Sequence, residues 1–314
     1  MWKPYTILRF LDFELSNSIE IISKRSAMDF GHTSVTIPLK AAVRSGFLNL
    51  ERNIKRGQTI EIEMGYDNVK SDLITGYIGR VNIGKTDITL DIEDKSFLLR
   101  SSLENKSFAK ATLKEIVQYI TNGFGFEITG DLPDINYENF KILNTTSLEA
   151  FKQLCSSTGM VHFFTSDGKL YVGFNYLYKS GEVKVDTKYI VENNLTVKNA
   201  AEKLIKIRAT SFLKDNTKLN VEVGDEGGDL KTNHYRNITT ESELKILAEN
   251  DLKKYKYDGY EGSFKSFLLP KVDVAGTCKL YDNGLYKGDY YITETNVNVN
   301  ASGAFRTISL GIKL

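Results

Sequence analysis

The sequence predicts a mainly β protein in which two related β-barrel domains flank a small α+β domain. Two observations lead to this prediction. A series of short alternating strands near the start of the chain returns in a similar order at its end, and two units of helix, glycine and strand lie between the two series. A strand series that recurs within one chain indicates a repeated domain, and closure into a barrel removes its exposed edges. We expect the domains at residues 1–103, 104–178 and 179–314.

The first domain contains six short runs that are rich in β-branched and aromatic residues. Several of them alternate apolar and polar side chains with a period of two. Such strands bury one face and expose the other, which favours a barrel or sandwich over a parallel sheet covered on both faces. The expected strands are Tyr5–Leu11, Ser18–Ser23, Thr33–Leu39, Thr59–Met64, Leu73–Ile83 and Thr86–Ile92.

Capped helices mark the second domain. Thr112 and Glu115 form a capping box, in which the threonine hydroxyl accepts from the third amide and the glutamate reaches back. Ser147 is the expected cap of the next helix, and Gly123 and Gly159 supply left-handed ends. Strands are expected at Phe124–Ile128, Met160–Phe164 and Leu170–Phe174, with a core of Leu113, Ile116, Val117, Ile120, Phe151 and Leu154.

The third domain returns to strands and includes one helix. Leu204–Phe212 and Lys218–Val223 are expected to form a hairpin pair. Thr240 and Glu243 begin a third capped helix, whose apolar face is expected to cover the second barrel. That face consists of Leu244, Leu247, Leu252 and Tyr255. The closing strands follow Tyr260–Leu269. Their order corresponds to that of the first domain, with Gly57 equivalent to Gly276, Gly76 equivalent to Gly288, and the strand end Ile92 equivalent to Ile312.

The composition is that of an ordinary globular protein. The 314 residues are 41% hydrophobic and 26% charged, and the formal net charge is +1. We therefore expect neither nucleic-acid recognition nor binding to an anionic membrane surface. No stretch approaches the roughly 20 apolar residues of a membrane span. The N-terminus lacks the apolar core of a signal peptide, so cytosolic synthesis is expected. Cys155 and Cys278 are expected to be buried free thiols.

The sequence predicts no catalytic, cofactor-binding or metal-ligating residues. His32, His162 and His234 lie far apart with no metal-ligand spacing, and His162 is expected to be structural. No nucleophile elbow or phosphate-binding loop occurs.

Four weaker candidates are interpreted structurally. The carboxylates Asp91, Glu93 and Asp94 could serve a glycosidase, but a solvated strand face explains them more simply. Asp225–Asp229 is interpreted as a hairpin tip rather than a cation loop, and Asp282–Gly284 as a hairpin turn. Tyrosines crowd the last part of the chain, and an assembly surface is preferred to a ligand platform. They are Tyr255, Tyr257, Tyr260, Tyr281, Tyr286, Tyr290 and Tyr291.

Four segments, taken in order, resemble a known family. They are Gly57–Tyr66 with Leu73–Val81, then Thr112–Ile120, then Ser147–Met160 with the turn Asp167–Leu170, and finally Gly288–Thr295 with Gly303–Ile312.

The family is that of the tail hub proteins of contractile phage tails and related injection machines, namely the late control protein D family and the hub part of VgrG. Such hubs are similar to a doubled tail-tube subunit. The resemblance implies two tail-tube-like barrels and a homotrimer that joins a six-fold tube to a three-fold spike. The alternating strands Thr59–Met64 and Thr307–Ile312 are expected at or near the contacts that close this ring.

The resemblance also implies where the protein is found and what it contacts. Expected partners are the tail tube protein, other baseplate proteins and a spike. The spike should be a separate polypeptide, because the chain stops at Leu314 directly after the last strand whereas VgrG proteins continue. The expected location is a virion tail baseplate or an injection-machine particle, after synthesis in the bacterial cytoplasm, and no enzyme activity is implied. Two alternatives stay open: a cell-wall-degrading hydrolase of the same machine, and a glycan-binding β protein.

Overall fold

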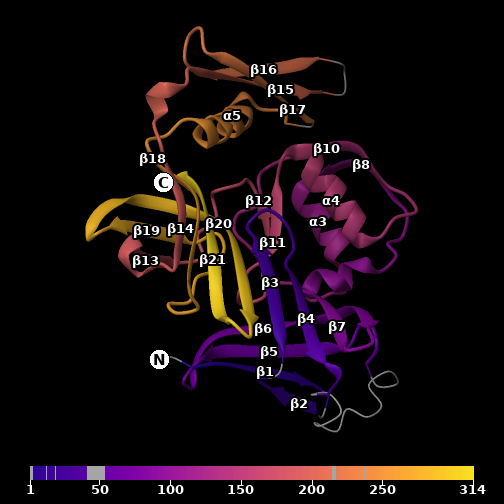
Figure 1. Ribbon diagram of the computed structural model, residues 1–314. Coiled ribbons are helices and arrows are strands. Elements are labelled where there is room, and N and C mark those ends of the chain that lie inside the picture. The colour runs from indigo at the N-terminus through magenta and orange to yellow at the C-terminus, as the bar shows by residue number, and fades with distance from the viewer. Residues whose placement is uncertain (1–2, 12, 18, 41–53, 214–216, 237) are drawn as a thin grey trace.

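The predicted mainly β fold is confirmed in a computed structural model (Figure 1). It describes residues 3–11, 13–17, 19–40, 54–213, 217–236 and 238–314. One 13-stranded sheet holds the strands from both ends of the chain, and three smaller sheets hold those from the middle. Three helices, α3, α4 and α5, lie to one side of the large sheet and above it (Figure 1).

The first β unit is an antiparallel series with the spatial order β3-β4-β7-β6-β5-β1-β2. Each of the six expected runs forms a strand, although Ser18 lies outside the described residues. An additional strand, β2, was not predicted. The strands are β1 (Pro4–Phe10), β2 (Phe13–Ser16), β3 (Glu20–Ser26), β4 (His32–Pro38), β5 (Thr59–Tyr66), β6 (Val69–Ile83) and β7 (Asp87–Glu93).

The second β unit comes from the end of the chain and has the spatial order β13-β19-β20-β21-β18-β14. Its bounds are β13 (Glu182–Asp186), β14 (Glu192–Lys198), β18 (Gly259–Phe267), β19 (Thr277–Asp282), β20 (Leu285–Asn300) and β21 (Gly303–Lys313).

The two units share one strand order, as the sequence predicted. In chain order, β1, β3, β4, β5, β6 and β7 correspond to β13, β14, β18, β19, β20 and β21, and corresponding strands have corresponding neighbours. The equivalent hairpins turn on equivalent left-handed pairs, Asp67-Asn68 and Asn283-Gly284. One pairing differs, because β1 is antiparallel to β5 whereas β13 is parallel to β19.

The two units meet in one continuous sheet. β3 of the first unit pairs antiparallel with β20 of the second, from Ser26 opposite Glu294 to Ile21 opposite Val299. We call this pairing the seam. Val297 and Val299 of β20 lie in the hydrophobic core of the first unit, so the second unit completes the core of the first.

The expectation that Thr59–Met64 and Thr307–Ile312 lie at edges that close a ring is wrong. They belong to β5 and β21, and each of these strands is paired on both sides within the chain. Their side chains alternate in burial because one sheet face covers the core, and Ile60, Ile62 and Met64 point into it.

The α+β layer contains two short sheets and two helices. The capping box is confirmed, since the Glu115 amide donates to Thr112 Oγ1 at 3.2 Å and the Thr112 amide donates to Glu115 at 2.7 Å. The second helix is capped by Thr146 rather than Ser147, and it ends at Gly159 as predicted. The elements are β8 (Lys106–Thr112), α3 (Leu113–Thr121), β9 (Ile128–Thr129), β10 (Asn136–Ile142), α4 (Ser147–Thr158), β11 (Val161–Phe164) and β12 (Leu170–Gly173).

The expected strand Phe124–Ile128 is largely wrong, because only Ile128 enters a strand, and Phe124 and Phe126 stack on each other with ring centroids 5.5 Å apart. The six predicted core residues of this layer are all buried.

The third sheet and its helix, which we call the inserted sheet, interrupt the second β unit. It comprises β15 (Ile205–Phe212), β16 (Lys218–Gly224), β17 (Asp229–Arg236) and α5 (Glu241–Tyr255), and lies in the chain between β14 and β18. The predicted hairpin pairing of β15 with β16 is confirmed.

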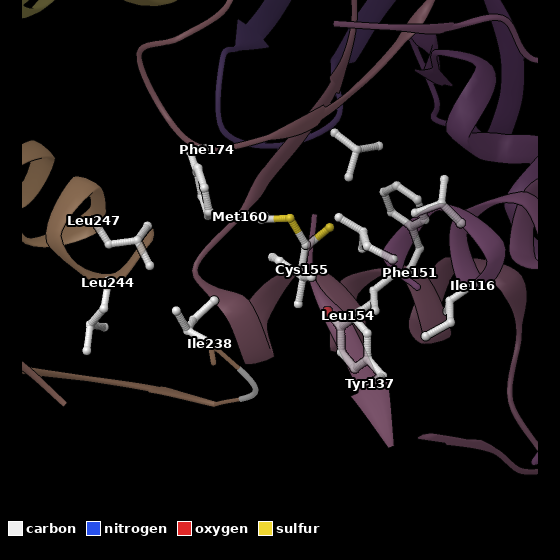
Figure 2. Packing of buried hydrophobic residues seen from close by; sticks show 14 of the residues in the cluster. Ile116, Tyr137, Phe151, Leu154, Cys155, Met160, Phe174, Ile238, Leu244 and Leu247 are labelled. Carbon is white, nitrogen blue, oxygen red and sulfur yellow. The ribbon is translucent and has the colours of Figure 1, made fainter. Parts of the chain in front are cut away.

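The predicted packing of α5 on the second barrel is wrong. Leu244 and Leu247 share one core with Leu154 and Phe151 of the α+β layer (Figure 2). An amphipathic helix identifies its buried face but not the surface that covers it.

Candidate functional site

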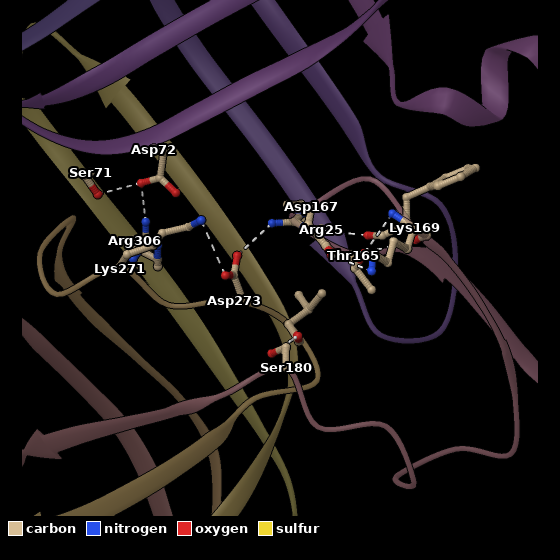
Figure 3. Close-up of polar contacts among 12 residues, drawn as sticks. Arg25, Ser71, Asp72, Thr165, Asp167, Lys169, Ser180, Lys271, Asp273 and Arg306 are labelled. Carbon is tan, nitrogen blue, oxygen red and sulfur yellow. Dashed lines mark hydrogen bonds and ion pairs between the residues drawn. The ribbon is translucent and has the colours of Figure 1, made fainter. Parts of the chain in front are cut away.

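A group of buried and partly buried polar contacts between distant parts of the chain lies beside the seam. A cavity of about 270 Å³ lies there, lined by strands of both β units and by the turn between β11 and β12. Figure 3 shows the side chains that converge on it. They come from three regions that are far apart in sequence, which makes this the candidate site.

Arg306 of β21 forms the centre of the first contact. Its side chain is 0% exposed, and its guanidinium donates to the carbonyls of Leu268 at 2.9 Å and Pro270 at 3.1 Å. It also forms an ion pair with Asp72 of β6, which accepts from Ser71 at 2.6 Å. Burial lowers the pKa of the Arg306 guanidinium, and the Asp72 carboxylate opposes that shift. An arginine stays charged in such a site, so the contact locks the two β units together.

Arg25 of β3 makes the second contact. One terminal nitrogen lies 3.0 Å from a carboxylate oxygen of Asp273, in the loop before β19. The other donates to the Phe164 carbonyl of β11 at 3.3 Å. One guanidinium therefore connects the first β unit, the second β unit and the α+β layer, a use that suits its fixed fork of donors.

The turn between β11 and β12 closes the cavity. Gly168 adopts a left-handed φ of 78°, and its carbonyl accepts from Lys95 Nζ at 2.9 Å. Thr165 holds the turn, because its hydroxyl accepts from the Lys169 amide at 2.9 Å. The turn that resembles the hub family therefore contacts the first β unit.

The acidic cluster considered for catalysis has structural partners. Glu93 lies 2.7 Å from Arg100 in an ion pair, and Asp91 lies 3.9 Å from His32. Asp94 caps the short helix η1 (Lys95–Arg100), accepting from the Ser96 amide at 2.9 Å, and desolvation raises the pKa of its carboxyl. Asp91 and Glu93 lie on the less buried face of β7, as predicted, whereas Asp94 lies beyond the strand and does not share that face.

Of the other two acidic candidates, only Asp282–Gly284 forms a hairpin turn. The interpretation of Asp225–Asp229 as a hairpin tip is wrong, because this segment connects β16 to β17, and both strands pair with β15 rather than with each other. Asp225 accepts from the Ile205 amide at 3.0 Å and forms an ion pair with Lys256. Asp282 precedes the left-handed pair Asn283-Gly284, which confirms the predicted hairpin turn.

The histidines and cysteines also occupy structural positions. His162 is buried with its ring centroid 4.6 Å from that of Phe30, and its Nε2 lies 3.3 Å from Asp29. Both cysteines are buried and neither forms a disulfide, and burial raises the pKa of Cys278 to about 12. Among the described residues, no group of three or more histidine, cysteine or carboxylate side chains could hold a metal ion. No helix in the described part of the chain is long and apolar enough to cross a membrane.

The tyrosines do not form one surface. Tyr290 and Tyr291 are buried in two different cores, so the assembly-surface interpretation is wrong for them. Tyr286 is 56% exposed at the β19–β20 hairpin and lies 5.5 Å from the Tyr281 ring.

The contacts of Arg306 and Arg25 were not predicted from the sequence. A signal was present for Arg306. In β21 the side chains of Ala304, Ile308 and Leu310 point inward with a period of two, and Arg306 falls on the same face. A charged residue at an inward strand position indicates a buried partner.

Comparison with known proteins places the fold. No family model matches the sequence, and no curated protein matches it. A tail protein from Neisseria meningitidis has a similar structure, with a TM-score of 0.66, 12% identity, and coverage of 98% of this chain and 96% of that one. The prophage MuSo2 43 kDa tail protein from Shewanella oneidensis has a TM-score of 0.62 and 16% identity, with coverage of 98% and 97%.

A third similar structure is an E. coli component of the type VI secretion system, described as structurally similar to the T4 bacteriophage tail proteins gp27 and gp5. Its TM-score is 0.60 at 9% identity, over 98% of this chain and 77% of that one. The chain therefore shares the fold of these phage tail proteins.

Proposed function

We propose that this protein is a structural subunit of a phage-type tail baseplate, a trimeric hub between a six-fold tail tube and a three-fold spike. The observation that carries the proposal is the doubled strand order, with both copies joined in one continuous sheet by the seam. A chain with two equivalent units needs three copies to present six, which is the number a six-fold tube would contact.

The contacts at the seam support a structural role. A subunit that transmits load between tube and spike needs its two units held in one orientation. The buried ion pair of Arg306 with Asp72 and the three-way contact of Arg25 provide such a hold. Removing one partner from a buried charge pair costs much more free energy than removing one from an exposed pair. The buried pair therefore favours one arrangement of the two β units.

The partners follow from the same proposal. The six β units would contact the tail tube protein on one face of the ring and a spike protein on the other, with further baseplate proteins around it. The α+β layer and the inserted sheet would lie outside the ring, since they share their own core to one side of the large sheet. The particle would be a virion tail or a related injection machine, assembled after synthesis in the bacterial cytoplasm.

The proposed domains need one adjustment. We retain 1–103, 104–178 and 179–314 as the units of the chain, but assign the inserted sheet to the outer layer because its core residues belong there.

Light scattering coupled to size-exclusion chromatography tests the oligomeric state. The proposal predicts a particle of three chains, each of 35.4 kDa. A particle that stays monomeric at every concentration, and also when mixed with the purified tube protein of the same tail, would contradict the hub role.

A further inference from the structure

We propose that β14 of one copy of this chain pairs with the second half of β6 in the next copy, with Val197 opposite Val81 and Leu195 opposite Ile83. The inference rests on the proposed ring and identifies the strands that close it. Its partner is a second copy of the same chain.

The first observation is that β14 is covered on one edge only. Within the described residues it pairs with β18 and with no other strand. Its counterpart β3 is paired on both edges and buries Ile21 and Ser23 completely or nearly so. In β14, by contrast, Val197 is 76% exposed. An unprotected strand edge with an exposed β-branched residue is a template for pairing with another chain.

The second observation is that the end of β6 is also covered on one edge only. Up to Ile78, β6 runs beside β5 and the residues just before it. From Arg80 to Ile83 it pairs with β7, and no other described strand lies along its outer edge. Ile83 is 46% exposed there.

The third observation is that the equivalent place in the second unit is occupied. The second half of β20, the counterpart of β6, pairs with β3 at the seam. Since β14 is the counterpart of β3, the strand that fills this place by analogy is β14. It cannot be the β14 of the same chain, because that strand lies at the far end of the large sheet from β6.

Matching bulges give the correspondence of β6 with β20. Gly79 is the extra residue between Ile78 and Arg80, where the partner strand β7 continues without a gap. Thr293 is the extra residue at the same place in β20, opposite β21. Val81 therefore corresponds to Thr295, and Ile83 to Val297.

The neighbouring strands give the correspondence of β3 with β14. Ile21 lies opposite Val35 of β4, and Asn193 lies opposite Phe264 of β18. Val35 pairs with Leu90 of β7, and Phe264 pairs with Ile308 of β21. Leu90 directly precedes the residue opposite Arg80, and Ile308 directly precedes the residue opposite Glu294, so Val35 and Phe264 occupy equivalent places. Hence Ser23 corresponds to Leu195, and Arg25 to Val197.

The register at the seam then transfers to the contact between copies. At the seam Val297 lies opposite Ser23 and Thr295 opposite Arg25. The corresponding pairs are Ile83 with Leu195 and Val81 with Val197. Both pairs are apolar.

The cores of the two units support the same contact. At the seam, Val297 of β20 completes the core beneath β3. Leu195 is only partly buried against the core of the second unit. Ile83 of the neighbouring copy would cover it in the same way. The next pair on this face, Lys85 with Asn193, is polar and marks the end of the apolar part of the contact.

The proposed contact joins the copies in a ring, as the hub proposal requires. The surfaces of β14 and β6 differ, so the contact is head-to-tail, which yields a ring or a filament. Repetition of the relation already present at the seam would place six β units around one axis.

Engineered disulfides test the register. We expect the double variant Val81→Cys with Val197→Cys to form intermolecular disulfides under mild oxidation, because directly opposite strand positions lie close together. The native cysteines are buried and give no background. The matched control is Val81→Cys with Thr196→Cys, whose second side chain points to the other face and should not cross-link.

A charge substitution gives an independent readout. Val197→Lys should weaken assembly by roughly tenfold or more in dissociation constant, since it places a charge in the apolar pairing. Its thermal unfolding as a monomer should match the wild type because the side chain is exposed. Val191→Lys, also exposed at 45% but outside the pairing, should assemble normally.

The outcomes separate this inference from the hub proposal. A trimer with no cross-link at this pair and unaffected by Val197→Lys would overturn the inference and leave the hub role standing. A wild-type chain that stays monomeric alone and with the purified tube protein, together with a Val81→Cys and Val197→Cys variant that forms no cross-link, would overturn both.

Discussion

The two β units have the same strand order but differ in what covers their edges. In the first unit β3 and β4 are joined by a short loop, and β3 is buried between two strands. In the second unit the inserted sheet separates β14 from β18, and β14 has one partner among the described strands. Where two repeats share a topology, the strand that is buried in one and exposed in the other indicates the surface that another chain covers.

The largest expected effect concerns the seam. Arg306→Ala should lower the free energy of unfolding by about 3–5 kcal/mol, because it leaves Asp72 and two carbonyls without their buried donor. Urea denaturation measures it. A cycle with Asp72→Ala should show strong coupling, and an Arg306→Ala effect no larger than that of an exposed ion pair would show that the units are not locked here.

The next effect concerns the core that the α+β layer shares with the inserted sheet. Leu154→Ala should cost about 2–5 kcal/mol, as truncation of a buried leucine does. Because Leu154 shares its core with Leu244 of α5, hydrogen exchange should increase in α5 as well as in α4. Faster exchange in α4 alone would mean that the inserted sheet is energetically independent of the α+β layer.

A smaller effect compares the equivalent hairpins. Gly284 has a φ of 81° with no atom near its missing Cβ, so Gly284→Ala should cost about 1–2 kcal/mol through backbone strain alone. Asn68→Gly, at the matching position of the first unit, should be neutral or slightly stabilising. Thermal unfolding of both variants checks this, and a harmless Gly284→Ala would show that the turns are not equivalent.

The smallest effect also lies on the seam. Lys24 and Glu294 form an ion pair of 3.0 Å with exposed side chains of 58% and 33%. Glu294→Gln should change stability by less than about 1 kcal/mol, since solvent screens such pairs. Comparison of Glu294→Gln with Arg306→Ala separates the stability contribution of an exposed ion pair from that of a buried one. Equal effects of the two substitutions would refute that distinction.

Much of the fold could be predicted from the sequence because local patterns determine it. Period-two alternation locates β5, and the residues Thr112 and Glu115 locate the start of α3. The strand β14 was missed because most of its residues are polar and only Leu195 and Lys198 are partly buried within the chain, so its apolar pattern is weak. The partner of α5 was missed because an apolar helix face does not specify what covers it.

The site was less predictable than the fold. The contacts of Arg25 and Arg306 join residues hundreds of positions apart, and their geometry depends on the seam, which no local pattern reveals. The acidic residues considered as catalytic candidates, such as Glu93, have partners close by in the sequence.

Electron microscopy of the purified protein tests the central claim most directly. We expect rings of three chains with six β units around the axis, alternating between the β3–β20 seam within a chain and a β14–β6 contact between chains. Two-fold dimers, or particles in which β14 remains uncovered by a neighbouring chain, would contradict the account.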